Sequence, residues 1–222
     1  TGFQVAGLPY ASYKDGEGYA GGGNLYFYQY GDGQRSPYVW NTILGFKLST
    51  EGAISSYFFL DMPEIVGDNS RFNFYIEYKS YLVDDFYGLG NNPDFNLDYI
   101  QKDHPDYRDK FYYSFKQKWP GLSVSMQLPF FLPQTRHFFS LIHYNRKITA
   151  YSLPNTLKQN KPVGFNGGTT STAQYGLVYD SRDQEAVPHS GAWSEFLAEY
   201  ATPVLGSDYE YLRLTFTDRR YI

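Results

Sequence analysis

Aromatic side chains alternate with charged and polar ones along strand-length segments of this chain. Between residues 71 and 79, one set of alternate positions holds Phe72, Phe74, Ile76 and Tyr78, and the other includes Arg71, Asn73, Glu77 and Lys79. Successive side chains of a β-strand point to opposite faces of its sheet, so this segment predicts a strand with one apolar and one charged face. No other feature limits the folds open to the chain as strongly.

The same alternation recurs between residues 110 and 119. It predicts one face with Phe111, Tyr113, Phe115 and Trp119, and an opposite face with Lys110, Lys116 and Lys118. A soluble β-sandwich also alternates, but here the charged face is rich in Lys and Glu, and aromatic residues, 20% of the chain, dominate the apolar face. That composition is expected of a transmembrane β-barrel, which is apolar outside, polar in its lumen and ringed by aromatic girdles.

The overall composition restricts the alternatives. A length of 222 residues suits one domain or one barrel, and a mean hydropathy of −0.50 is compatible with a barrel because half of each membrane strand faces a wet lumen. No apolar run approaches the roughly 20 residues of a membrane helix. The net charge of −4 argues against a nucleic-acid partner, and the absence of cysteine excludes disulfides and thiolate sites. No signal peptide opens the sequence, so we expect a mature form or a fragment.

The predicted fold class is all-β, an antiparallel transmembrane β-barrel of which about nine strands are visible. The strands are predicted at residues 19–30, 38–49, 53–61, 70–82, 108–119, 135–151, 174–182, 192–201 and 209–218. Residues 1–18 are interpreted as a periplasmic lead-in segment and residues 19–222 as the partial barrel. No window of adequate length predicts a helix, and no fixed-period repeat indicates a propeller or a solenoid.

Two long polar segments, residues 84–107 and 153–169, separate predicted strands. Membrane barrels have short periplasmic turns and longer outer loops. If the strand at 19–30 rises from the periplasm, the tight turn at Glu51 lies inside, as expected, but segment 84–107 then lies inside as well. We therefore expect either an uncounted strand or an unusual long loop on the periplasmic side.

The most specific motif lies between residues 175 and 193. A strand ending in Asp180, Arg182 and Asp183 is followed by a short turn with Pro188 and Gly191, and then by an aromatic-led strand. This arrangement resembles the strand–turn–strand of the BamA-type outer-membrane barrel superfamily, the bacterial surface-antigen family. Residues 87–92 and 209–221 resemble, more loosely, a loop and a later strand of the same barrels.

The resemblance implies both an architecture and a role. Members form sixteen-stranded barrels, usually preceded by periplasmic POTRA domains, and insert or translocate other proteins at the bacterial outer membrane without covalent catalysis or a cofactor. The implied partners are outer-membrane lipid and other outer-membrane or periplasmic proteins. Because the sequence shows neither a POTRA-like region nor the later V-R-G-[FY] motif, we expect it to cover the N-terminal half of such a barrel.

In this family the first and last strands meet at a weak seam that opens sideways. By resemblance, the predicted strand 19–30 is the candidate gate strand, with candidate residues Gly21, Gly22, Gly23, Leu25 and Phe27. Glycines weaken a strand interior, which suits a seam that unzips. The alternative is that the glycine run is only a flexible lead-in to the sheet.

Asp180 and Arg182 have the same strand parity, while Tyr175, Leu177 and Tyr179 occupy the other face. Both charged side chains are therefore predicted to point into the lumen, where the pair could hold a lumen loop in place. The alternative is an exposed ion pair at a hairpin end, which contributes about 0–1 kcal/mol. Either role is structural, and since no nucleophile elbow, P-loop or dinucleotide motif is present, no enzyme activity is predicted.

Metal binding has little support in the sequence. Asp94, Asn96 and Asp98 are spaced like the start of a calcium loop, but a proline holds the twelfth position, where such a loop needs a bidentate Glu. His137 and His143 share a predicted face but lie about 20 Å apart at the rise of a strand, too far to share an ion. No metal and no cofactor are predicted, and the aspartate loop stays a weak calcium candidate.

Two other functions remain open on the sequence alone. The chain could form a passive outer-membrane porin or a surface-binding barrel, which stable conductance without effect on other barrels would indicate. It could also be a soluble β-sandwich that binds carbohydrate through its aromatic side chains, which solubility without detergent would indicate.

Overall fold

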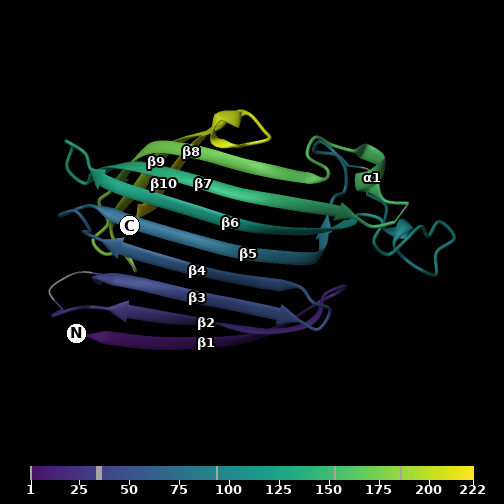
Figure 1. Cartoon of the computed structure of the whole chain (residues 1–222), viewed down its shortest axis with the longest axis horizontal. Helices are drawn as coiled ribbons and strands as arrows, with labels where there is room; N and C mark the ends of the chain where they lie inside the picture. Colours follow the sequence, from purple (N-terminus) through teal and green to yellow (C-terminus); the bar gives the residue numbers. More distant parts are fainter. Residues whose placement is uncertain (1, 34–36, 94, 153, 186) are drawn as a thin grey trace.

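The computed structural model describes residues 2–33, 37–93, 95–152, 154–185 and 187–222. Ten antiparallel strands form one sheet, in which each strand pairs with its neighbours along the chain. They are β1 (Phe3–Lys14), β2 (Gly18–Gln29), β3 (Trp40–Ser49), β4 (Ile54–Pro63), β5 (Arg71–Asp85), β6 (Ser114–Pro129), β7 (Thr135–Ala150), β8 (Gly167–Asp180), β9 (Gly191–Ala201) and β10 (Tyr211–Tyr221). The sheet curves, so that β9 and β10 lie behind β6–β8 in Figure 1.

The strand register separates two faces of the sheet. One row of cross-strand partners is polar throughout, with Asn41, Asp61, Asn73, Ser125, Ser140, Gln174, Glu199 and Arg213. The next row, on the opposite face, is mostly apolar, with Thr42, Leu60, Phe74, Val124, Leu141, Ala173, Tyr200 and Leu212. We call these the inner and the outer face.

Exposure shows which environment each face suits. On the inner face, Asp61 is 1% and Glu199 3% exposed, whereas on the outer face Leu141 is 60% and Leu212 64% exposed. Buried polar and exposed apolar side chains are the reverse of a soluble domain and match the wall of a membrane barrel. The sandwich alternative is wrong, because no second sheet covers the outer face within the described residues. The prediction of an all-β, antiparallel barrel wall is confirmed.

The first strand was missed by the sequence analysis. Residues 1–18 were interpreted as a lead-in segment, but Phe3–Lys14 pairs with β2 along its whole length. Gly7 and Pro9 interrupt the strand pattern there, because proline lacks a backbone N–H to donate and glycine has no side chain to pack.

Counting β1 as a strand changes the side of the membrane on which each connection lies. With β1 counted, the long connection 86–113 lies at the end of the sheet away from the start of β1, on the same side as the turn at Glu51 and the connection 151–166. Figure 1 shows these long connections gathered at one end, together with the short helix α1 (Thr156–Asn160). If β1 rises from the periplasm, the long connections lie outside, as in other membrane barrels.

The segment 110–119 differs from its prediction. β6 begins only at Ser114, and Trp119 is buried on the inner face, where its indole N–H donates to Glu77 Oε1 over 2.8 Å. Lys116 and Lys118 are exposed on the outer face. The alternation was correct, but the assignment of aromatic side chains to the outside was wrong because a buried hydrogen bond holds the indole inside.

The remaining elements are short. Besides α1, the connections contain two 3-10 turns, η1 (Leu97–Tyr99) and η2 (Pro203–Leu205). The buried Asn155 caps α1 by accepting from the Lys158 N–H and donates to the carbonyl oxygens of Phe111 and Ser114. Among the described residues, no helix has the length and apolar character needed to cross a membrane.

Candidate functional site

A charged network lies on the inner face near the end of the sheet that carries the 181–190 turn. Its centre is Asp61 on β4, which accepts from Arg71 Nε over 2.7 Å and from Asn73 Nδ2 over 2.6 Å. Tyr38, in the connection before β3, also donates its hydroxyl to Asp61. A buried carboxylate that accepts from this many donors holds three segments together.

The 181–190 turn joins this network from far along the chain. Arg71 Nη1 donates to Glu185 Oε1 over 2.6 Å, and Arg182 Nη1 donates to the Glu185 carbonyl oxygen over 3.1 Å. The turn between β8 and β9 is therefore bound to the start of β5, across the intervening strands β6 and β7. We call the set Tyr38, Asp61, Arg71, Arg136, Asp180, Arg182 and Glu185 the inner latch.

The motif pair Asp180 and Arg182 forms the second half of the inner latch. Arg182 donates from Nε to Asp180 Oδ1 over 2.8 Å and from Nη2 to Oδ2 over 2.9 Å, a bidentate pair. Arg136 on β7 adds a bond of 3.2 Å to Asp180 Oδ2. Both guanidinium groups lie over the Trp193 ring, at 4.6 Å for Arg182 and 5.9 Å for Arg136. The inward direction inferred from strand parity agrees with this geometry.

The other motif residues shape the turn itself. Asp183 Oδ1 accepts from the backbone N–H groups of Gln184, His189 and Ser190 over 2.9–3.2 Å, which fixes the path of the turn. Gly191 has φ +101, and a Cβ there would lie 2.2 Å from the Ser181 carbonyl oxygen, so the position accepts only glycine. Pro188 is half-buried within the same turn.

The turn gives a pH-dependent prediction for the Asp183→Ala variant. The backbone N–H of His189, and then those of Ser190 and Gln184, lower the pKa of Asp183 below its ordinary value of 3.8. A carboxyl with a lowered folded pKa stabilises the fold above its ordinary pKa, and the effect is lost as pH falls through the folded value. We expect the wild type to melt at a higher temperature than Asp183→Ala at pH 5 and above, with a gap that narrows below pH 3.8. Thermal melts in detergent across this range check it, and a gap independent of pH would contradict it.

The chemistry of the inner latch is structural. Each of its carboxylates is paired with at least one guanidinium, and Trp193 contacts Arg136 and Arg182, so the set holds strands and a turn rather than presenting a free acid or base. The sequence indicated Asp180, Arg182 and an inward Arg71. It carried no signal for Glu185 or Tyr38, because their partners lie far away along the chain.

The candidate gate residues lie in the second strand, so their assignment to the first strand was wrong. Gly21, Gly22, Gly23, Leu25 and Phe27 all belong to β2, between β1 and β3. Of the three glycines, Gly22 is the one that a close approach inside the sheet requires. A Cβ on Gly22 would lie 2.2 Å from the Phe46 carbonyl oxygen, the same oxygen to which Tyr10 of β1 donates its hydroxyl over 3.3 Å.

The structure describes only two of the three residues of the calcium candidate. Asp94 lies outside the described residues, and Asn96 uses its side-chain oxygen to cap η1 by accepting from the Asp98 N–H. Asp98 instead groups with His104 and Asp106, with ligand atoms within 4.8 Å of one another on the molecular surface. Such exposed groups are common without a bound ion, and the group gives no support for a calcium loop.

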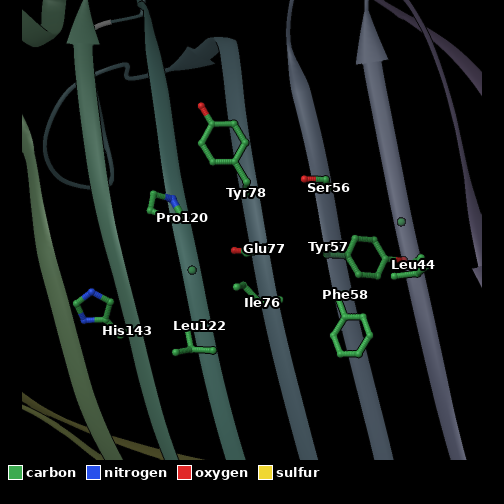
Figure 2. Close-up of a pocket in the computed structure, with 12 residues that line it drawn as sticks. Leu44, Ser56, Tyr57, Phe58, Ile76, Glu77, Tyr78, Pro120, Leu122 and His143 are labelled. Carbon is green, nitrogen blue, oxygen red and sulfur yellow. The ribbon is translucent and has the colours of Figure 1, made fainter.

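The outer face carries a shallow hollow of about 570 Å³ between β3 and β7. Leu44, Phe58, Ile76, Leu122 and His143 form one register row along it, and Ser56, Tyr78 and Pro120 form the next. Figure 2 shows Tyr78 and Pro120 beside one another at one end, and Leu122 near His143 further along. Small side chains at Ser56 and Pro120 leave this part of an otherwise bulky apolar surface open.

Comparisons with known proteins give the chain relatives. The family model described as the Omp85 superfamily domain matches residues 44–222. Among solved structures, the crystal structure of BamA from Haemophilus ducreyi lacking POTRA domains 1–3 is similar, with a TM-score of 0.52 and 15% sequence identity. The likeness covers 96% of this chain and 36% of that chain, so this chain spans little more than a third of its structural relative. No curated protein sequence matches significantly.

Proposed function

This chain belongs to the Omp85 superfamily of outer-membrane β-barrels, and we propose that it acts in the insertion or translocation of other proteins at the bacterial outer membrane. The barrel wall is in contact with outer-membrane lipid, and the partners are other outer-membrane or periplasmic proteins. The action is mechanical and involves no covalent catalysis. Its basis is a contrast between the exposed edge strand β1 and the firmly held part of the sheet from β4 to β9.

The exposed edge strand β1 is the observation that carries the proposal. Every side chain of Phe3–Lys14 is exposed, and among the described residues β2 is the only strand that pairs with it. Pro9 removes one backbone donor, and Gly7 adds no side chain to pack. The ladder on the free side of β1 is therefore available to another strand, either the closing strand of the barrel or a strand of a client protein.

The firmly held part is the sheet from β4 to β9. The inner latch ties the start of β5 to the turn after β8, and Arg136 adds β7 to the same network. Movement is then concentrated at the β1 edge, because opening elsewhere would expose paired charges in the lumen wall. In this proposal the candidate gate strand is β1 in place of the strand at 19–30.

A disulfide lock tests the proposal in the complete barrel. Because the chain has no cysteine, Leu8→Cys on β1 can be paired with one cysteine on the closing strand. The control lock joins Ser12 and Ala20, register partners in the β1–β2 ladder, as cysteines. We expect the first lock to reduce the insertion of other barrels in cells until reductant is added, and the control lock to leave insertion unchanged.

Two results would count against this mechanism. Normal client insertion with β1 locked would show that the seam is not used. Unchanged insertion together with a stable, size-selective conductance in planar bilayers would indicate the passive porin instead. The measurement is the surface abundance of an unrelated barrel protein before and after reduction. The proposal expects this abundance to be low with β1 locked and to recover with reductant, whereas both contrary results leave it unchanged.

A further inference from the structure

The outer face changes abruptly from apolar to cationic along β6. Its outward positions are apolar from the 129 end up to Pro120, namely Leu128, Met126, Val124, Leu122 and Pro120. The next two outward positions are Lys118 and Lys116, both exposed. On β7 the outward Lys147 lies at the same level. Three lysines therefore stand together on the membrane-facing side of the wall, directly beyond its apolar band.

The cluster is electrostatically unsatisfied. Lys118 and Lys147 are direct register partners, and like charges directly opposite one another destabilise an antiparallel pair. Neither has an ion-pair partner within the described chain, and a hollow of about 270 Å³ between them is lined by Ser80 and Thr149 but by no carboxylate. Lys116 also lies over the Tyr151 ring at 5.0 Å. An anion held between Lys118 and Lys147 would remove the repulsion.

Nearby carboxylates do not fill this role. Asp15 and Glu51 line a different hollow, which includes Lys110 and Lys116. Asp84 accepts from the inward Gln117 side chain. The pair Lys118 and Lys147 thus faces the surroundings of the wall with two unpaired positive charges.

The lysine cluster lies next to the apolar hollow of the outer face. Pro120 of that hollow is two residues from Lys118 on the same strand face, about 7 Å at the rise of a strand. On β5, Tyr78 of the hollow is likewise two residues from Ser80 of the lysine hollow. Figure 2 shows Tyr78 and Pro120 at the end of the apolar hollow. A cationic pair at one end of an apolar groove matches a lipid, with a charged headgroup joined to acyl chains.

The orientation of the barrel wall indicates which leaflet of the membrane the lysines face. The lysines lie at the end of the sheet with the long connections 86–113 and 151–166, and in bacterial barrels the longer loops are extracellular. We propose that β5–β7 bind a phosphorylated glycolipid of the outer leaflet, a lipopolysaccharide, with a phosphate between Lys118 and Lys147 and acyl chains in the apolar hollow. Ser80 and Thr149 supply hydroxyls to the same headgroup.

The test uses the purified complete barrel, freed of lipid in detergent, and fluorescent lipopolysaccharide as probe. We expect saturable binding that falls at least about tenfold in Lys118→Glu/Lys147→Glu, since both cationic contacts to the anionic headgroup are lost and charge reversal adds repulsion. Lys102→Glu/Lys161→Glu is the matched control, because it makes the same charge change in connections at the same end, and its affinity should be unchanged. Heat-modifiable migration on gels shows that each variant is folded.

The single variant Lys147→Glu separates binding from folding. It places opposite charges at the Lys118 register position, so the barrel without lipid should melt at a higher temperature than wild type. Its affinity for lipopolysaccharide should nevertheless fall. A lower melting temperature together with unchanged affinity would overturn the proposal.

Competition identifies the source of the phosphate. Dephosphorylated lipopolysaccharide should compete poorly, and so should phosphatidylglycerol vesicles and inorganic phosphate. Equal competition by phosphatidylglycerol would overturn the assignment to the outer-leaflet glycolipid and indicate a glycerophospholipid. Equal binding by wild type and the double lysine variant would overturn the site altogether.

Discussion

Replacing Gly191 by alanine is expected to destabilise the barrel wall so strongly that little folded protein forms. The residue opens β9 with φ +101, and a Cβ would lie 2.2 Å from the Ser181 carbonyl oxygen. Left-handed backbone costs an L-residue about 1–2 kcal/mol, and the contact adds to this because neither backbone segment can move freely. Ser181 and Ala192 are held by their own hydrogen bonds, with Ser181 N–H donating to the Ala192 carbonyl over 2.9 Å.

The measurement is heat-modifiable migration, followed by urea unfolding of whatever folds. We expect Gly191→Ala to lose more than about 3 kcal/mol of unfolding free energy or to fail to give the compact band. Gly52→Ala is the matched control, because Gly52 also has positive φ, +90, but has open space where a Cβ would go. It should lose only about 1 kcal/mol from the backbone conformation. An equal loss of unfolding free energy in the two variants would show that the close contact at Gly191 does not contribute to the effect.

Removing the Asp61 carboxylate is the second change with a large expected effect. Asp61 is 1% exposed and is the acceptor for Arg71, Asn73 and Tyr38. In Asp61→Ala the guanidinium of Arg71 keeps its charge within the wall and retains only Glu185 as an ionic partner. Breaking a buried ion pair from one side costs about 3–5 kcal/mol, so the unfolding free energy should fall by that amount.

The unfolding free energy is measured by urea unfolding in detergent, with tryptophan fluorescence as the signal. Asp218→Ala is the control, because Asp218 pairs with Arg220 on an exposed part of β10, and its removal should leave the unfolding free energy almost unchanged. The double variant Asp61→Ala/Arg71→Ala should be less destabilised than the sum of the single variants, since both charges leave together. A loss at Asp61 no larger than at Asp218 would mean that the inner latch contributes little.

Local patterns in the sequence predicted much of the wall. The period of two along residues 71–79 places Arg71 and Asn73 inside and Phe72 and Phe74 outside, as the structure has them. Parity alone was sufficient because strand geometry is repetitive and needs no knowledge of neighbouring strands. The motif from Asp180 to Gly191 was found by its resemblance to a family of barrels, and the Omp85 match covers it.

Features that depend on partners far along the chain were not predictable. β1 contains Gly7 and Pro9, which interrupt the local pattern, and its pairing with β2 is what makes it a strand. The inward side of Trp119 follows from a hydrogen bond to Glu77, a residue of another strand. Glu185 had no distinguishing pattern, because its role depends on the approach of Arg71 from β5.

The sequence by itself determined that this protein forms antiparallel strands with one apolar and one polar face, because alternation is a property of each strand alone. The tertiary structure decided how those strands meet. Register placed Lys118 against Lys147, the turn after β8 brought Glu185 to Arg71, and strand order placed β1 rather than the glycine-rich strand at an edge of the sheet. These arrangements depend on cross-strand distances of a few ångströms between distant segments, and no local pattern encodes them.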